Sequence, residues 1–195
     1  MLSSLRQIDQ HILFFLNHLG ASGVLRDVVI RLLATGLIYA LLGIVLYLFL
    51  RKPGGKQVLF LALGSAFAAV VVGKVINQIV PRDRPFVVFP GDVRHVALIV
   101  RPDSFPSIHV VAAFGLAGGV LFGPHRVWGA LMLLLALFMA VARVAAGAHW
   151  PSDVAGGALI GLAMAAILAK IQRYYWSRPG SGEEQYADDD SVPKG

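Results

Sequence analysis

Two histidines lie at the start of two apolar segments, each beside residues suited to phosphate chemistry. His109 follows the pair Pro106 and Ser107, and His149 is followed four residues later by Asp153. A carboxylate can accept a hydrogen bond from one imidazole nitrogen, which fixes the tautomer and leaves the other nitrogen to act as a nucleophile. One histidine can attack while the other protonates the leaving oxygen. The pattern predicts nucleophilic catalysis with a separate general acid.

Arginines accompany both histidines. Arg84 precedes Pro85, and Arg143 lies six residues before His149. A guanidinium presents fork-shaped donors that match phosphate oxygens. An arginine at the end of a span is usually an interfacial anchor, and a histidine at a helix start is usually a cap or a satisfied polar residue. Anchoring does not explain why two arginines, two histidines, a serine and an aspartate gather at the ends of short apolar segments.

The backbone adds to this predicted anion site. Pro106 and Pro151 each precede an apolar stretch and suit the first helical position, where the missing N–H costs nothing. Both helices are therefore predicted to begin on the same membrane face. Two helix N-termini at one face direct unpaired N–H groups and positive dipole ends at a shared space.

Composition identifies the fold class. Of the 195 residues, 57% are hydrophobic and 14% are charged, whereas soluble domains carry about 25% charged residues. This excludes a soluble globular protein and favours an all-α integral membrane bundle. The chain has no cysteine, which excludes disulfides, thiolate catalysis and cysteine-ligated metal sites. The basic residues are scattered between apolar spans, so nucleic acid is not an expected partner.

Segments without Lys, Arg, Asp or Glu predict five transmembrane helices, at 32–50, 57–73, 104–125, 127–142 and 154–169. Several are shorter than the roughly 20 residues that cross a bilayer, so their charged ends are expected at the interface or in a polar cavity. The N-terminal segment has an apolar face interrupted by charges, which predicts an interfacial helix or a sixth span. One membrane-embedded domain is expected over 1–176, with a disordered acidic tail over 177–195.

Orientation follows from the basic residues near the span ends. With five spans, the segments holding Arg51 and Lys52, Arg126, and Lys170 and Arg173 share one face, which the positive-inside rule makes cytoplasmic. The expected location is the bacterial plasma membrane, with the histidines and their arginines on the extracytoplasmic face. Arg82, Arg84 and Arg94 lie on this disfavoured side, and phosphate binding would explain them.

Three segments, which run from Asn77 to Pro85, from Pro106 to His109 and from Ala142 to Asp153, resemble the signature of the type 2 phosphatidic acid phosphatase (PAP2) superfamily. That signature is Lys-x6-Arg-Pro, Pro-Ser-Gly-His and Ser-Arg-x5-His-x3-Asp. The resemblance implies that His149 is the nucleophile, that Asp153 orients it and that His109 is the general acid. Arg84, Ser107 and Arg143 would hold the phosphoryl oxygens without a metal or other cofactor. It also implies a bundle of about six spans, with the N-terminal segment as the sixth.

Three positions depart from this signature. Asn77 replaces the family lysine, Ile108 replaces the glycine of Pro-Ser-Gly-His, and Ala142 replaces the serine before Arg143. Lys74 and Arg82 are the candidates to supply the missing charge, and Arg82 is favoured because it shares a loop with Arg84. Ile108 keeps its backbone N–H, so an active site is still expected.

The sequence therefore predicts a membrane lipid phosphatase that works through a phosphohistidine, with undecaprenyl pyrophosphate as the first choice of substrate. Resemblance to the small bacterial pyrophosphatases of the superfamily supports this choice. Phosphatidylglycerophosphate, phosphatidic acid and lipid A phosphatases are alternatives. A non-enzymatic alternative is a small transporter or a haem-bearing subunit with His109 and His149 as axial ligands. The oligomeric state is left open.

Overall fold

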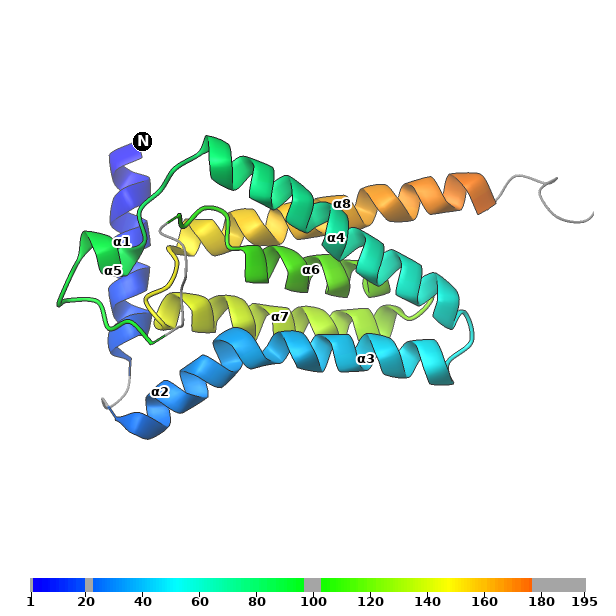
Figure 1. Cartoon of the computed structure of the whole chain (residues 1–195), viewed down its shortest axis with the longest axis horizontal. Coiled ribbons are helices and arrows are strands. Elements are labelled where there is room, and N and C mark those ends of the chain that lie inside the picture. Colours follow the sequence, from blue (N-terminus) through cyan, green and yellow to red (C-terminus); the bar gives the residue numbers. More distant parts are fainter. Residues whose placement is uncertain (1, 20–22, 97–102, 177–195) are drawn as a thin grey trace, which may run out of the picture.

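Long helices run side by side along one axis of the molecule (Figure 1). The computed structural model describes residues 2–19, 23–96 and 103–176. Within these ranges the bundle consists of α3 (Leu37–Arg51), α4 (Gly55–Ile79), α6 (Ile108–Leu121), α7 (Arg126–Ala145) and α8 (Pro151–Trp176). The predicted all-α membrane bundle is confirmed: among the described residues four helices are long and apolar enough to span a membrane, and α6 is a shorter apolar helix at the position of the fifth predicted span. The predicted acidic tail, 177–195, lies outside the described residues.

The first span begins earlier than predicted. The short helix α2 (Val24–Arg31) continues through a π-helical turn, Leu32–Gly36, into α3, which gives one apolar helix of 28 residues. Its charged first turns do not end the helix because tertiary contacts satisfy them. Arg94 forms an ion pair with Asp27 at 2.5 Å, and Arg31 donates to the carbonyl of Val96.

The helix α6 lies at the centre of the bundle and contacts α4, α7 and α8. It has 14 residues, fewer than any other span in the described bundle. Glycines allow the close approach of its neighbours. A Cβ on Gly119 would lie 2.5 Å from the carbonyl oxygen of Leu61 on α4, and a Cβ on Gly161 of α8 would lie 2.7 Å from that of Val111. Small residues thus hold the central helix in place, as is common in membrane bundles.

The two predicted helix starts have different outcomes. Pro151 is the first residue of α8, as predicted. Pro106 is not the first residue of α6, because the helix begins at Ile108 with Ser107 as its N-cap. The carbonyl of Phe105 accepts a hydrogen bond from Asn77 at 2.8 Å, which holds the chain at Pro106 in the preceding loop. Both helices nevertheless begin at the same end of the bundle (Figure 1).

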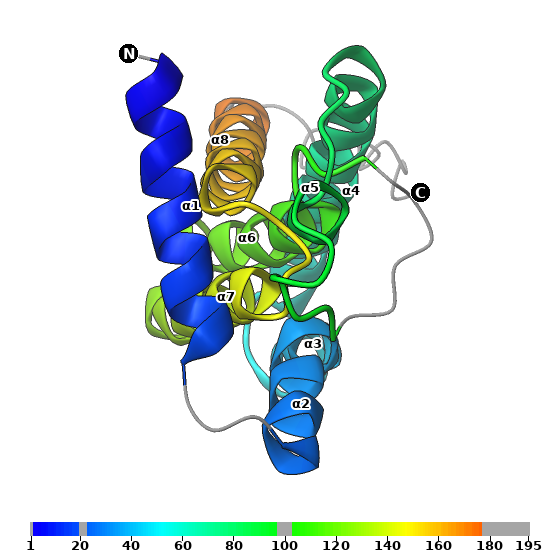
Figure 2. The same cartoon turned by 90° about the vertical axis from the view of Figure 1, so that its left-hand side faces the viewer.

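The N-terminal helix α1 (Leu2–His18) runs across the end of the bundle rather than along it (Figure 2). Its buried face carries Asp9, Leu13 and Asn17, while Ile8 and Phe15 are exposed. Asn17 donates to the carbonyls of Arg94 and Ala145, both at 2.9 Å. Of the two alternatives for this segment, the arrangement favours the interfacial helix.

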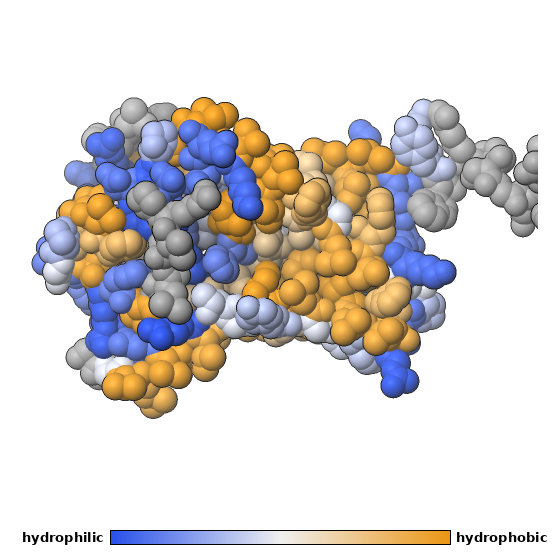
Figure 3. All heavy atoms as spheres, in the orientation of Figure 1, coloured by the Kyte–Doolittle hydropathy of each residue, from blue (hydrophilic) through white to orange (hydrophobic). Residues whose placement is uncertain are grey.

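On the face shown in Figure 3, an apolar band covers the middle of the bundle between two polar ends. One end carries α1 and the loops that precede α6 and α8. The other end carries the α3–α4 turn, where the carbonyl of Pro53 accepts a hydrogen bond from His125 at 2.9 Å, together with the end of α8 (Figure 1). The predicted grouping of the basic span ends on one face is therefore present. The chain is an integral membrane protein.

Candidate active site

The site forms where three loops meet beside α1. One loop follows α4, one precedes α6 and one joins α7 to α8. Gly147 has a φ of +69°, and a Cβ there would lie 2.6 Å from the carbonyl oxygen of Arg94. Only glycine adopts this backbone conformation easily. The tight turn places His149 inside the protein, where it is 2% exposed.

The tautomer of His149 follows from its hydrogen bonds. Nδ1 lies 2.9 Å from the backbone carbonyl oxygen of Ser104. A carbonyl can only accept, so Nδ1 carries the proton and Nε2 carries the lone pair. Nδ1 is 3.6 Å from Oδ2 of Asp153. The carbonyl of Ser104 is therefore the closer acceptor for Nδ1, whereas the sequence predicts the Asp153 carboxylate in this role.

Two guanidiniums face the lone pair of His149. Nη2 of Arg143 lies 3.0 Å from Nε2, and Nη1 of Arg84 lies 3.2 Å from it. Arg84 also donates to the carbonyl of Ala148 at 2.8 Å. In the part of the chain that the structure describes, Nε and Nη1 of Arg143 and Oγ of Ser107 are buried without a hydrogen-bond partner. Buried donors without partners are costly, and a bound anion would satisfy them.

Burial and charge keep the His149 imidazole neutral. Desolvation lowers the pKa of His149 from 6.5 to about 4, the charges of Arg143 and Arg84 act in the same direction, and Asp153 opposes them. The imidazole therefore has its lone pair available near neutral pH. Burial also lowers the pKa of Arg84, although Asp153 and Asp103 raise it. A guanidinium remains charged under these conditions.

Asp153 is held on both of its carboxylate oxygens. Oδ2 accepts from the hydroxyl of Ser104 and, at 2.9 Å, from the N–H of Trp150. Oδ1 accepts from Arg82 at 2.7 Å. The carboxylate is completely buried, so these donors both stabilise its charge and fix its orientation beside His149.

His109 differs from His149 in its exposure. It lies in the first turn of α6, immediately after Ile108, and it is exposed. It is nevertheless within electrostatic reach of Arg143 and Arg84. An exposed imidazole at the opening of a buried anion site can reach a leaving oxygen and exchange its proton with water.

The two candidates for the missing lysine charge, Lys74 and Arg82, are not brought together with Asn77 at His149. Lys74 is exposed on α4. Asn77 donates to the carbonyl of Phe105. The guanidinium of Arg82 binds the carboxylates of Asp9 and Asp153, each at 2.7 Å, and the hydroxyl of Ser152. In the described structure, Arg82 is directed at carboxylates rather than at Nε2 of His149.

Three contributors were missed by the sequence analysis. Ser104 supplies both the acceptor for His149 and a donor to Asp153. Asp9 of α1 binds Arg82 and the N–H of Ser152. His95 stacks on Phe86 with ring centroids 4.1 Å apart. Asp9 is an acidic residue near the apolar positions Ile8, Ile12 and Leu13 of the N-terminal segment, which was a usable signal, whereas no local pattern marks Ser104 or His95.

The fold and the site define an integral membrane protein with a buried histidine that faces two buried arginines. Within the described residues no group of three or more His, Asp or Glu side chains could hold a metal ion. The family model described as the PAP2 superfamily matches residues 57–177. The chain belongs to the PAP2 superfamily and is a membrane phosphatase. This membership replaces the transporter and haem alternatives.

Similar proteins support this assignment. The chain is 30% identical to the bacitracin transport permease protein BcrC of Bacillus licheniformis, over 85% of this chain and 78% of that protein. It is 37% identical to the putative undecaprenyl-diphosphatase YbjG of Escherichia coli K12, over 63% of this chain and 60% of that one. The structure of Aquifex aeolicus LpxE matches with a TM-score of 0.69 and 25% identity, over 84% of this chain and 95% of LpxE.

A second solved structure supports the fold alone. The PAP2-type phosphatidylglycerolphosphate phosphatase from Bacillus subtilis matches with a TM-score of 0.61 and 18% identity, over 91% of this chain and 90% of that chain.

Proposed function

We propose that this phosphatase hydrolyses a polyprenyl pyrophosphate, with undecaprenyl pyrophosphate as the substrate and undecaprenyl phosphate as the lipid product. One observation carries the proposal that the chemistry is phosphoryl transfer: Nε2 of His149 faces Arg84 and Arg143 beside buried donors that have no partner among the described residues. The names of relatives supply the substrate class, because YbjG and a Sulfolobus acidocaldarius relative are described as undecaprenyl-diphosphatases.

In the proposed first step, the lone pair of His149 Nε2 attacks the terminal phosphorus. A P–N bond forms and the bond from phosphorus to the bridging oxygen breaks. His109 gives its proton to that oxygen, and the lipid monophosphate leaves. Arg84, Arg143 and Ser107 would donate to the phosphoryl oxygens as charge develops on them.

In the proposed second step, water hydrolyses the phosphohistidine. His109, now neutral, takes a proton from the attacking water, the P–N bond breaks and inorganic phosphate is released. Nδ1 of His149 keeps its proton throughout because the carbonyl of Ser104 accepts from it. The charge on the protein is the same before and after the cycle.

A panel assay tests the substrate. Phosphate release is measured from undecaprenyl pyrophosphate, phosphatidylglycerophosphate, phosphatidic acid and lipid A 1-phosphate in mixed micelles. We expect the largest kcat/KM on undecaprenyl pyrophosphate. A larger value on lipid A 1-phosphate would move the assignment to that lipid. The proposed mechanism uses no metal, so EDTA is expected to leave the rate unchanged.

We also propose that the site faces the extracytoplasmic side of a bacterial plasma membrane. Arg51, Lys52, Lys56 and Arg126 at the opposite end support this orientation. Gly91 is exposed in the loop beside the site, and the chain has no cysteine of its own. A Gly91→Cys variant should react with an impermeant maleimide in intact cells. Labelling only after cell disruption would reverse the proposed orientation.

A further inference from the structure

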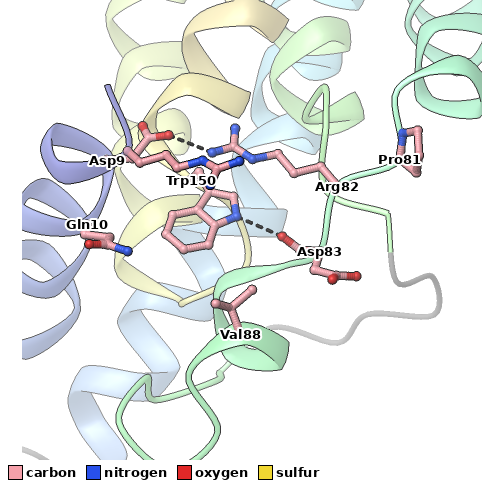
Figure 4. A pocket seen from close by; sticks show the side chains of 8 residues that line it. Asp9, Gln10, Pro81, Arg82, Asp83, Val88 and Trp150 are labelled. Atoms are coloured by element: carbon pink, nitrogen blue, oxygen red, sulfur yellow. Dashed lines mark hydrogen bonds and ion pairs between the residues drawn. The ribbon is translucent and has the colours of Figure 1, made fainter. Parts of the chain in front are cut away.

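A line of charged groups connects α1 to the carboxylate beside His149. Arg82 uses its two terminal nitrogens on different partners, because Nη2 donates to Asp9 and Nη1 donates to Asp153. Figure 4 shows the Asp9 end of this line, with the Arg82 guanidinium between Asp9 and Trp150. The Cζ atom of Arg82 lies 5.2 Å from the centre of the Trp150 ring. Arg82 is therefore held by two carboxylates and an aromatic face.

Asp9 has a second attachment to the same place. Its carboxylate accepts from the N–H of Ser152 at 2.9 Å and from the Ser152 hydroxyl at 2.5 Å. Ser152 precedes Asp153 in the first turn of α8. The side chain of Asp9 is 9% exposed, so water does little to screen these contacts. The interfacial helix α1 is thus fastened to the helix turn that carries Asp153.

We propose that Arg82 is a positioning residue: anchored by Asp9, it fixes and neutralises the Asp153 carboxylate and thereby orients His149, and it does not bind the substrate phosphate. This inference rests on the proposed role of His149 as the nucleophile. It replaces the sequence-based expectation that Arg82 substitutes for the family lysine at Asn77.

The contacts explain why this carboxylate needs a cationic partner. Ser104 and the N–H of Trp150 donate to Oδ2 of Asp153, while Arg82 is the charged donor to Oδ1. Without Arg82, a buried negative charge would lose its compensation on one side. Arg84 already interacts electrostatically with Asp153. Drawing Arg84 toward the carboxylate would remove a phosphate donor from His149.

Four variants of the full-length protein test the proposal. Arg82→Gln removes the charge, Arg82→Lys keeps it, and Asp9→Asn removes only the anchor. Arg6→Gln is the matched control, because Arg6 is also on α1 and lines a cavity of about 370 Å³ together with Asp9 and Arg82. Turnover is measured on undecaprenyl pyrophosphate and on p-nitrophenyl phosphate. Inorganic phosphate is used as a competitive inhibitor to report binding in the anion site.

A positioning role predicts a loss in kcat without a loss in phosphate affinity. We expect Arg82→Gln to lower kcat about 100-fold and Asp9→Asn to lower it about 5-fold, with the Ki for phosphate changed less than about twofold. Arg82→Lys should recover part of the loss. A fifth variant that combines Arg82→Gln with Asp9→Asn should resemble Arg82→Gln alone, because the Asp9 contribution acts through Arg82. Arg6→Gln should retain the wild-type kcat.

Other results would overturn the proposal. An increase in KM and Ki with unchanged kcat in Arg82→Gln would show that Arg82 binds phosphate, and Asp9→Asn would then tighten phosphate binding by releasing the guanidinium. Wild-type kcat in both Arg82→Gln and Asp9→Asn would show that Arg82 does not position Asp153 for catalysis. If Arg82→Gln does not fold, judged by thermal unfolding, Asp9→Asn decides alone. Wild-type activity on p-nitrophenyl phosphate but not on the lipid would overturn only the proposed substrate.

Discussion

Basic side chains occur at both ends of the bundle, but their surroundings differ. Beside α1, Arg84 and Arg143 are 7% and 3% exposed and their guanidiniums converge on one imidazole. At the opposite end, Arg51, Lys52 and Lys56 are exposed. Arginine occurs in both regions, so burial and convergence, rather than residue type, distinguish an arginine proposed to bind phosphate from one that lies at the interface.

The largest expected effect comes from His149. His149→Ala should abolish turnover on every substrate and abolish the acid-labile phosphoenzyme, because no other group can form the covalent bond. The measurement is trapping with ³²P-labelled substrate. His125→Ala, a histidine at the opposite end, is the matched control and should keep nearly full activity. Phosphate trapped on His109, or undiminished trapping in His149→Ala, would show that the nucleophile is misassigned.

Loss of His109 should be large but incomplete. A general acid typically contributes about 10²–10⁴-fold, so His109→Ala should lower kcat within that range on a lipid phosphomonoester. The loss should be smaller on p-nitrophenyl phosphate, whose leaving group needs little protonation. Comparing the two substrates measures this difference. Equal losses on both would argue against a role in leaving-group protonation.

Gly147 tests how much the turn before His149 matters. Gly147→Ala would require an alanine in the left-handed region, which costs about 1–2 kcal/mol, and its Cβ would meet the Arg94 carbonyl oxygen. We expect at least about a tenfold loss of kcat and a lower unfolding temperature. Gly91→Ala is the control, because Gly91 also has positive φ but nothing within 4 Å of its Cβ position. Similar losses in both would mean that strain alone is responsible.

The pH profile tests the electrostatics of the buried end. Because burial lowers the pKa of His149 to about 4, the imidazole is neutral above that pH and becomes protonated below it. The acid limb of kcat/KM should therefore fall about tenfold per pH unit below about pH 4, rather than below 6.5. The assay uses p-nitrophenyl phosphate with circular dichroism to confirm folding. An acid limb centred near 6.5 that is unchanged in His109→Ala would contradict a desolvated nucleophile.

The smallest effect is expected at the opposite end. Lys52→Gln combined with Lys56→Gln removes two exposed charges, and kcat should stay within about twofold of wild type, since exposed charges contribute little. The assay is phosphate release in micelles, where orientation in a membrane does not matter. A tenfold loss would show that this end is coupled to the site and would weaken the comparison.

Local patterns predicted most of the fold and the centre of the site. Charge-free windows located the four long apolar helices and the shorter α6, because hydropathy is a local property of each segment. The spacing of Arg143, His149 and Asp153 identified a loop and the helix that follows it, and the structure places those three side chains together. These features depend on residues close in sequence, where periodicity and turn chemistry are informative.

Contacts between distant residues are what local patterns do not predict. The first span begins earlier than the charge-free window indicates, and the pairing of Asp27 with Arg94 bridges 67 positions. The sequence favours Arg82 as a phosphate ligand because Arg84 is near it, while the partner that the structure shows for Arg82, Asp9, is 73 positions away. Pro106 was placed inside a helix because the Asn77 contact with the loop could not be seen. Ion pairs between residues far apart in the sequence produce no local spacing pattern from which they could be predicted.

The shortness of α6 affects how a substrate can reach the site. Fourteen residues rise about 21 Å, less than the ~30 Å of bilayer hydrocarbon, and α6 begins deeper in the bundle than α8 (Figure 1). Pulling a lipid into water costs about 0.8 kcal/mol for each CH₂ group, so ten such groups would slow the step by roughly a millionfold. A recessed site avoids this cost, because a head group can arrive by lateral diffusion while its chain stays in the bilayer.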